Sequence, residues 1–303
     1  MRDADLAGLR LGIFGKGGAG KSTVTVLLAH ALREVGQPVA VFDADSTNIG
    51  LAGALGIERE PDTLLDHFGG MVFSGGLVTC PVDDPTPLPS ATVELDRLPS
   101  RFVGVTAEGI RLLVAGKIGA MGPGAGCDGP IAKIARDVRF TVGGEPPITL
   151  VDFKAGFEDS ARGVVTSIDW AIVVVDPTVA SVQLAIHLVR IVQLIRQGVP
   201  PATRHLDRTD LVDLAVRQFH DAPIKGVVAV LNRVSDRETE QLLRSALAPA
   251  GPAVIGSLGE DPALQTSWLR GQRLDAADLE RTARGIARDL AQVVQYAGAS
   301  IDE

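Results

Sequence analysis

The fold of this chain is decided by one stretch, Gly15-Lys16-Gly17-Gly18-Ala19-Gly20-Lys21-Ser22-Thr23. It fits the pattern G-x-x-x-x-G-K-[ST] and follows the apolar run Leu9–Phe14, so we expect a strand, a glycine loop and the start of a helix. The glycines let the backbone curl with its N–H groups inward, and the helix that opens at Ser22 adds its positive end. A flexible glycine turn is the alternative. The complete match between a strand and a helix favours a polyphosphate site.

The pattern also assigns a role to individual side chains. Lys21 is expected to reach the β- and γ-phosphates of the nucleotide, and Ser22 is expected to bind Mg²⁺. We therefore predict that ATP or ADP is held by the loop and the first helical residues: Gly15, Gly17, Gly18, Ala19, Gly20, Lys21, Ser22 and Thr23.

A second lysine, Lys16, stands at the start of the loop, inside Lys-Gly-Gly-x-Gly-Lys-Ser-Thr. With this lysine the chain resembles the deviant-P-loop ATPases, which include MinD, ParA, the nitrogenase iron protein and CooC, the accessory ATPase of carbon monoxide dehydrogenase. The resemblance is strongest to the CooC branch. It implies an ATP-hydrolysing homodimer in which Lys16 crosses the interface to the partner's nucleotide. The alternative is a solvated lysine that only raises the local positive potential.

The composition is that of an ordinary globular chain and limits the possible partners. Of the 303 residues, 46% are apolar and 22% are charged, and the net charge is −8. Nucleic-acid binding needs clustered Lys and Arg, and the sequence has no basic run, so we expect no nucleic-acid partner. Two cysteines, Cys80 and Cys127, are too few for a disulfide framework in a chain of this length.

The ends and the apolar stretches of the sequence bear on where the protein resides. The first residues, Met1-Arg2-Asp3-Ala4-Asp5, carry acids where a signal peptide needs a positive region. No apolar stretch reaches the roughly 18 residues that a membrane span requires. We therefore expect a cytoplasmic protein without a membrane partner.

Short apolar runs alternate with helical patterns along the chain and predict the fold class. Runs without polar alternation indicate strands buried on both faces, and hence a mainly parallel sheet between layers of helices. We expect an α/β protein with one doubly wound sheet of seven to eight strands, as in P-loop NTPases. The runs are Leu9–Phe14, Pro38–Phe42, Ile110–Ala115, Ile148–Phe153, Trp170–Val175, Gly226–Leu231 and Ala253–Leu258.

We expect a single domain over residues 1–303 with two interruptions. Residues 69–101 are rich in Gly and Pro and predict an excursion on the rim of the sheet. Residues 198–223 exceed the usual connection length and predict an inserted helical segment with a helix over Asp207–Phe219.

Asp43-Ala44-Asp45 follows the second predicted strand, at the sheet edge where ligands bind in open α/β sheets. This position suits a carboxylate that orients water. In the resembled family the second acid of the pair has that task, which implies it for Asp45. The alternative is that Asp45 only caps a helix over Ser46–Leu55.

Two further strand ends carry motifs that the resemblance interprets. Val151-Asp152-Phe153-Lys154-Ala155-Gly156 is similar to the family's second phosphate motif. The similarity implies that Asp152 holds Mg²⁺ through water and that Gly156 lies near the γ-phosphate, although Lys154 replaces a common proline. A turn-forming Asp is the alternative. Leu231-Asn232-Arg233 resembles the motif whose Asn reads the adenine edge, a task that suits the paired donor and acceptor of Asn232.

A glycine loop with one cysteine, residues 116–129, is the most distinctive stretch. It resembles the metal loops of CooC and of the nitrogenase iron protein, which implies a shared site for Cys127 on the dimer axis. The match is incomplete, because the second Cys-x-Cys position is Gly129 and the iron protein's second cysteine corresponds to about Asp159. Ni²⁺, Zn²⁺ or an iron–sulfur cluster remain open as ligands, Cys80 is a competing thiol, and an incidental thiol is the alternative.

The sequence thus predicts a nucleotide-switched homodimeric ATPase that helps to mature the active site of a client metalloenzyme. Two other functions stay open. One is an electron-donating iron–sulfur reductase like the nitrogenase iron protein, which the missing cluster cysteine disfavours. The other is a MinD/ParA-like positioning ATPase, which the acidity and the lack of a basic tail disfavour.

Overall fold

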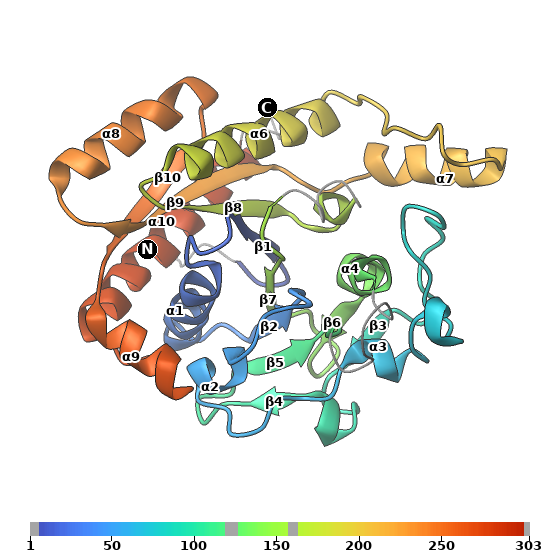
Figure 1. The fold of residues 1–303 in the computed structure, drawn as a ribbon, viewed down its shortest axis with the longest axis horizontal. Coiled ribbons are helices and arrows are strands. Elements are labelled where there is room, and N and C mark those ends of the chain that lie inside the picture. Colours follow the sequence, from blue (N-terminus) through green and yellow to red (C-terminus); the bar gives the residue numbers. More distant parts are fainter. Residues whose placement is uncertain (1–5, 119–126, 157–162, 300–303) are drawn as a thin grey trace.

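An eight-stranded sheet forms the centre of the molecule (Figure 1). The structure is a computed structural model that describes residues 6–118, 127–156 and 163–299. The strand order is β10-β9-β8-β1-β7-β2-β5-β4, and every neighbouring pair is parallel except β4 with β5. This confirms the mainly parallel sheet of seven to eight strands. The strands are β1 (Arg10–Gly15), β2 (Val39–Asp43), β4 (Gly104–Val105), β5 (Arg111–Val114), β7 (Ile148–Asp152), β8 (Trp170–Val175), β9 (Gly226–Val234) and β10 (Ala253–Gly259).

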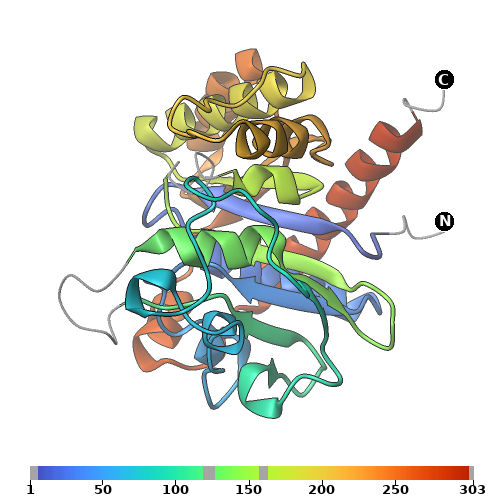
Figure 2. The ribbon, with the colours of Figure 1, turned by 90° about the vertical axis from the view of Figure 1, so that its right-hand side faces the viewer.

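Helices cover both faces of the sheet (Figures 1 and 2). One face packs against α1, α2, α9 and α10, and the other packs against α3, α4, α6 and α8. The helices are α1 (Lys21–Glu34), α2 (Leu51–Leu55), α3 (Leu64–His67), α4 (Asp128–Asp137), α6 (Val179–Arg196), α7 (Thr209–His220), α8 (Arg237–Leu247), α9 (Pro262–Arg270) and α10 (Ala277–Ala299).

Two apolar cores result from the alternation of side chains along the buried strands. In β1, Leu11 and Ile13 face the layer of α1 and α10, whereas Phe14 faces the layer of α4 and α6. Phe14 stacks on Phe153, with ring centroids 4.8 Å apart. Because both faces are apolar, the strands read as continuous apolar runs, which is why the sequence predicts them well.

The two interruptions contain short elements of their own. The segment at 69–101 holds a 3₁₀ turn, Val72–Ser74, and the strand β3 (Thr92–Glu94). β3 pairs in parallel with β6 (Arg139–Thr141), apart from the main sheet. The segment at 198–223 holds α7, in which no residue is fully buried. The assignment of the whole chain to one domain stays a prediction.

One helix of the described residues, α6, is long and apolar enough to cross a membrane by length and composition alone, contrary to the expectation that no stretch reaches that length. Its buried side chains, among them Leu184, Ala185 and Leu188, belong to the core on one face of the sheet. Core helices of globular proteins pass the same test, so α6 is weak evidence for a membrane.

Two boundaries differ from the sequence-based expectation. The helix expected over Ser46–Leu55 is only Leu51–Leu55, and its N-cap is Gly50, with φ 93°, rather than Asp45. The strand expected to end at Leu231 continues to Val234, so Asn232 lies inside β9. The first difference arises because the residues before Gly50 form a loop that a lysine side chain holds, as described below.

The parallel arrangement brings several functional candidates to one edge. The carboxyl ends of β1, β2, β5, β7, β8 and β9 all point to the same side of the sheet. Ligands of open α/β sheets bind at this edge, so the loops that follow these strands form the candidate site.

Candidate functional site

The glycine loop joins the end of β1 to the start of α1. Gly20 is the N-cap of α1 and has φ 93°, a conformation that favours glycine. A Cβ atom at Gly20 would lie 2.1 Å from Nδ2 of Asn232, which is closer than atoms approach. Asn232 Nδ2 instead donates a hydrogen bond to the carbonyl of Ala19, at 2.7 Å. Asn232 therefore holds the loop from β9, and its reading of adenine stays a prediction.

Oxygen atoms gather beside the first turn of α1. Ser22 Oγ donates to Asp152 Oδ2 at 2.6 Å, and Asn48 Nδ2 lies 3.2 Å from Ser22 Oγ. The other carboxylate oxygen, Asp152 Oδ1, is buried without a hydrogen-bond partner among the described residues. Burial raises the pKa of Asp152 to about 6, against the hydrogen bond from Ser22 and the charge of Lys21. A hydroxyl and a buried carboxylate with a spare oxygen fit a hydrated Mg²⁺ ion.

Lys117, for which the sequence motifs predict no role, holds the loop after β2 by hydrogen bonds. Its Nζ donates to Asp43 Oδ2 at 2.6 Å, to the Asp45 carbonyl at 3.0 Å and to the Asn48 carbonyl at 2.7 Å. Burial raises the pKa of Asp43 to about 7, although the Lys117 ammonium lowers it. The sequence does contain a signal for Lys117, because it follows the buried strand β5 at the same edge as Asp43.

Asp45 lies in a tight turn rather than at a helix N-cap. Its Oδ1 accepts hydrogen bonds from the backbone N–H of Thr47 at 2.9 Å and from Thr47 Oγ1 at 2.7 Å. The carboxylate is partly exposed at the sheet edge that also carries Ser22 and Asp152. This placement leaves the expected role of Asp45 in orienting water a prediction.

The two lysines of the loop have different surroundings. Lys21 is 7% exposed and contributes to the charge around Asp152. The Lys16 side chain is 37% exposed and pairs with Asp176, at the end of β8, with a distance of 3.4 Å between Nζ and Oδ2. Lys16 thus lies at the surface while Lys21 is buried, and their separate roles stay a prediction.

The segment after β7 contacts both the glycine loop and α4. The backbone N–H of Gly156 donates to the carbonyl of Gly15 at 3.3 Å. Lys154 pairs with Asp128, the first residue of α4. Asp128 also accepts a hydrogen bond from Ser46 Oγ, at 2.6 Å, in the loop after β2. One carboxylate therefore connects two loops of the nucleotide site.

Cys127 immediately precedes Asp128 and is the N-cap of α4. Its Sγ accepts a hydrogen bond from the backbone N–H of Gly129, at 3.4 Å. At the other end of the glycine–cysteine loop, the N–H of Ile118 donates to the carbonyl of Ser46 at 3.0 Å. Residues 119–126 and Asp159, the position of the second cluster cysteine in the iron protein, lie outside the described residues. Both described ends of the loop therefore contact the segment after β2.

The fold and this edge define a P-loop nucleotide-binding protein, with a glycine loop, an inward lysine and a Ser–Asp pair. Over residues 13–274 the chain matches the CobQ/CobB/MinD/ParA nucleotide binding domain. The match covers most of the chain. The chain belongs to this family, and it is an ATPase of the MinD/ParA type.

Individual relatives support the same family assignment. An ATP-binding protein of Methanocaldococcus jannaschii is 32% identical over 179 residues, which are 58% of this chain and 70% of that protein. The carbon monoxide dehydrogenase accessory protein CooC of Rhodospirillum rubrum is 29% identical over 181 residues, 59% of this chain and 67% of CooC. The septum site-determining protein MinD of Pyrococcus horikoshii, solved with Mg-ADP, has a TM-score of 0.55 at 18% identity and covers 94% of this chain and 95% of its own. At that identity the likeness shows the fold. The expected closeness to CooC is confirmed.

Proposed function

We propose that the protein is a nucleotide-switched, homodimeric ATPase that assists the maturation of a metalloenzyme's active site in the cytoplasm. One observation carries the proposal: Asp128, the neighbour of Cys127, bonds to Ser46 and Lys154 from two loops of the nucleotide site. A change in these loops on ATP binding or hydrolysis would move the first turn of α4. Similarity to CooC, an accessory protein of a metalloenzyme, supports the client class.

The nucleotide chemistry follows from residues around the glycine loop. Ser22 and, through water, Asp152 would hold Mg²⁺, and Asn48 keeps Ser22 in place. The ion would neutralise charge on the β- and γ-phosphates. Lys21 would bind those phosphates, and Asp45 would orient the attacking water. The main-chain N–H groups of the loop would carry the remaining phosphate charge.

Dimer closure would be completed by Lys16. In the described chain Lys16 pairs with Asp176 at 3.4 Å, a long contact for a half-exposed lysine. Such an ion pair contributes about 0–1 kcal/mol, so it gives little resistance when Lys16 turns to a partner's phosphates. In this role Lys16 would act as an arginine finger acts, and it would make hydrolysis depend on the dimer.

Anaerobic metal loading tests the proposed function. Protein prepared without oxygen is incubated with Ni²⁺, Zn²⁺ or Fe²⁺, with and without Mg-ATP, and its bound metal is measured after desalting. We expect metal that depends on Cys127 and increases with nucleotide. Equal metal in the wild type and in Cys127→Ala contradicts the proposal.

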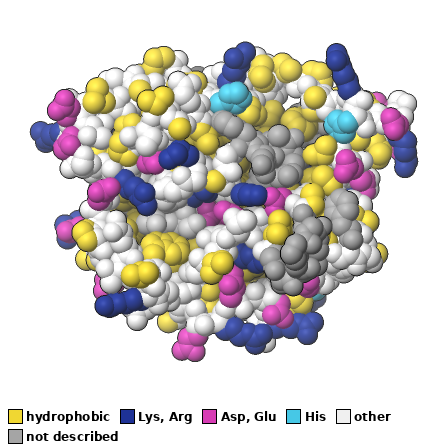
Figure 3. Space-filling model, in the orientation of Figure 1, with side chains coloured by type: hydrophobic (Ala, Val, Ile, Leu, Met, Phe, Trp, Pro, Cys, Tyr) yellow, Lys and Arg dark blue, Asp and Glu magenta, His cyan; other side chains and the backbone are white. Residues whose placement is uncertain are grey.

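The two other functions predict different results. A brown protein with iron and sulfide would indicate a reductase, and co-sedimentation with lipid vesicles or DNA in ATP would indicate a positioning ATPase. On the described part of the face in Figure 3, acidic and basic side chains are interspersed. A nucleic-acid surface is more one-sidedly basic.

A further inference from the structure

The other cysteine of the chain, Cys80, lies against Gly129, which occupies the second position of a Cys-x-Cys pair that begins at Cys127. An ideal Cβ atom built on Gly129 would lie 2.6 Å from Cys80 Sγ, 2.8 Å from its Cβ and 3.3 Å from its Cα. No side chain fits at position 129 while Cys80 stays in place. The thiol of Cys80 therefore fills the space that a residue at 129 would need.

Both sulfur atoms touch Gly129. Cys127 Sγ accepts the Gly129 N–H at 3.4 Å, and Cys80 Sγ packs over the Gly129 Cα. Both residues are partly exposed and neither forms a disulfide. Both thiols therefore lie against one residue in the first turn of α4.

A backbone hydrogen bond holds the turn that begins at Cys80. The N–H of Asp84 donates to the Cys80 carbonyl at 2.9 Å. Metal ions bind cysteine as the thiolate, so a bound ion would displace the thiol proton.

The same helix that carries Cys127 at its N-cap also holds this turn. Lys133 of α4 is buried, and its Nζ donates to Thr79 Oγ1 at 2.6 Å and to the Asp84 carbonyl at 3.0 Å. Helix α4 therefore fixes both thiols: Cys127 is its N-cap, and Lys133 binds the turn that carries Cys80.

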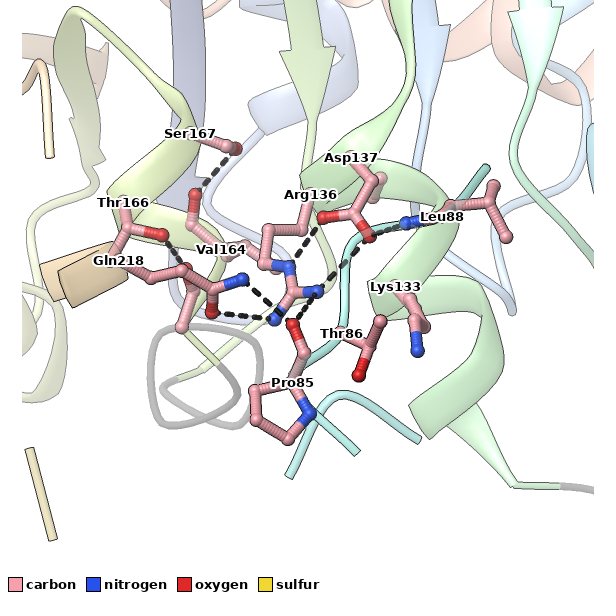
Figure 4. Close-up of polar contacts among 12 residues, drawn as sticks. Pro85, Thr86, Leu88, Lys133, Arg136, Asp137, Val164, Thr166, Ser167 and Gln218 are labelled. Carbon is pink, nitrogen blue, oxygen red and sulfur yellow. Dashed lines mark hydrogen bonds and ion pairs between the residues drawn. The ribbon is translucent and has the colours of Figure 1, made fainter. Parts of the chain in front are cut away.

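A second set of contacts extends this attachment along α4 (Figure 4). Arg136 Nη2 donates to the Pro85 carbonyl at 3.1 Å, and Gln218 of α7 donates to the same carbonyl at 2.7 Å. Asp137 accepts the N–H of Leu88 at 2.9 Å. The rim segment after Cys80 is therefore held in place by buried and charge-assisted hydrogen bonds.

We propose that Cys80 and Cys127 of one protomer form a two-thiolate site for a thiophilic divalent metal ion such as Zn²⁺, with Cys80 in place of a cysteine at 129. The inference rests on the proposed function and names the ligands of its cargo site. In this site the rim segment 69–101 supplies the second thiolate, that of Cys80. Thiolate ligands select Zn²⁺ and other soft ions over Mg²⁺.

The proposed site is open, because the two cysteines fill only part of a metal ion's ligand shell. Within residues 6–118, 127–156 and 163–299 there is no group of three or more Cys, His, Asp and Glu side chains that would hold a metal. Zn²⁺ takes four ligands, so two positions fall to water or to a client's side chains. An ion with exchangeable ligands can be passed on, which suits a carrier better than a closed structural site.

A cobalt titration tests the site on the intact, reduced protein under anaerobic conditions. Co²⁺ bound by thiolate gives a sulfur-to-metal charge-transfer band in the near ultraviolet, and Zn²⁺ competition then gives the affinity. Without nucleotide we expect one ion per protomer and a charge-transfer band. Cys80→Ser and Cys127→Ser should each weaken the band and lower the affinity at least about tenfold, the lower end of the effect of residues that only orient metal ligands.

The variant Gly129→Ala tests the geometry, because it keeps both thiols and displaces Cys80. We expect weaker metal binding with unchanged thiol content. The matched control is Gly285→Ala, also a helical glycine, where an added Cβ meets nothing within 4 Å. It should bind metal like the wild type, and circular dichroism checks that both variants fold.

Each of three results would overturn the inference. If Cys80→Ser binds the metal with wild-type affinity, Cys80 is not a ligand. The proposed function would stand in that case, because Cys127 could still bind the metal. Wild-type affinity in Gly129→Ala would remove the geometric argument. No binding by the wild type would remove the site. ATP-dependent dimerisation is measured on metal-free wild type, so its failure would refute the proposed switch separately.

Discussion

At the scale of single residues, the two lysines of the glycine loop should separate binding from turnover. Lys21→Ala removes charge-assisted phosphate contacts of about 1.5–3 kcal/mol each, so ATP binding should fall sharply. Lys16→Ala should keep ATP binding and lose turnover by about 10³-fold, the lower end for arginine fingers. Calorimetry and phosphate release measure the two effects. An equal loss of binding in both variants would refute the action of Lys16 across an interface.

The pKa of Asp152 makes nucleotide binding depend on pH. Its pKa of about 6 lies above the ordinary value of 3.8, so below pH 6 the metal-free chain holds this carboxyl protonated. Mg²⁺ favours the carboxylate, so Mg-ATP binding should release protons near pH 6 and strengthen as the pH rises through 6. The release should vanish above about pH 8.

Calorimetry in buffers of different ionisation enthalpy counts these protons. The variant Asp152→Asn is the control, because ATP itself titrates in this range and the variant retains only that contribution. The same proton release in the variant and in the wild type would show that Asp152 is not the titrating group.

At the scale of loops and helices, Asp128 should couple the nucleotide site to Cys127. The contacts of Asp128 with Ser46 and Lys154 are each of the order of 1–3 kcal/mol, enough to change a thiol's exposure or reactivity roughly tenfold. Mg-ATP should therefore change the rate at which Cys127 is alkylated, read by peptide mass spectrometry. In Asp128→Asn this change should be lost while ATP still binds.

An exposed aspartate on α7 provides the matched control. Asp210 pairs with Arg208 at the surface, so Asp210→Asn should respond to ATP like the wild type. If ATP alters Cys127 alkylation equally in both variants, coupling does not pass through Asp128.

The elements also show what a sequence can predict in this chain. The buried strands and the loop from Gly15 to Thr23 are local patterns, so apolar runs and glycine spacing predict them. The contacts of Lys117 with Asp43 and of Lys154 with Asp128 join segments far apart in sequence, and only the tertiary fold brings them together. The alternative for Asp45, a cap of a helix from Ser46, fails for this reason, because Lys117 binds the carbonyls of Asp45 and Asn48 in a loop that precedes α2.

The cysteines illustrate the same limit. The resemblance of the stretch around Cys127 to known metal loops predicts a metal site whose second cysteine is missing at Gly129. The approach of Cys80 depends on how residues 79–88 lie on α4, through Lys133, Arg136 and Asp137. No periodicity or motif encodes that contact. A glycine at 129 is a signal for it only once the neighbour is known.

At the scale of the whole molecule, the proposed function requires a dimer that closes with ATP and opens on hydrolysis. The role proposed for Asp45 is to orient water. Among the described residues, its carboxylate accepts hydrogen bonds from Thr47 and forms none with Lys21, Ser22 or Asp152 that an Asn would break. Asp45→Asn should therefore bind Mg-ATP, hydrolyse it slowly and stay closed. Asp210→Asn again serves as the control.

Light scattering of the Asp45→Asn variant, with and without Mg-ATP, tests whether ATP closes the dimer. We expect a monomer without nucleotide and twice that mass with Mg-ATP, stable for hours, while the wild type returns to the monomer as ATP is consumed. Adding Lys16→Ala to the variant should abolish the larger species. A monomeric mass in Mg-ATP, or a dimer whose amount ignores nucleotide, would contradict the nucleotide-driven switch.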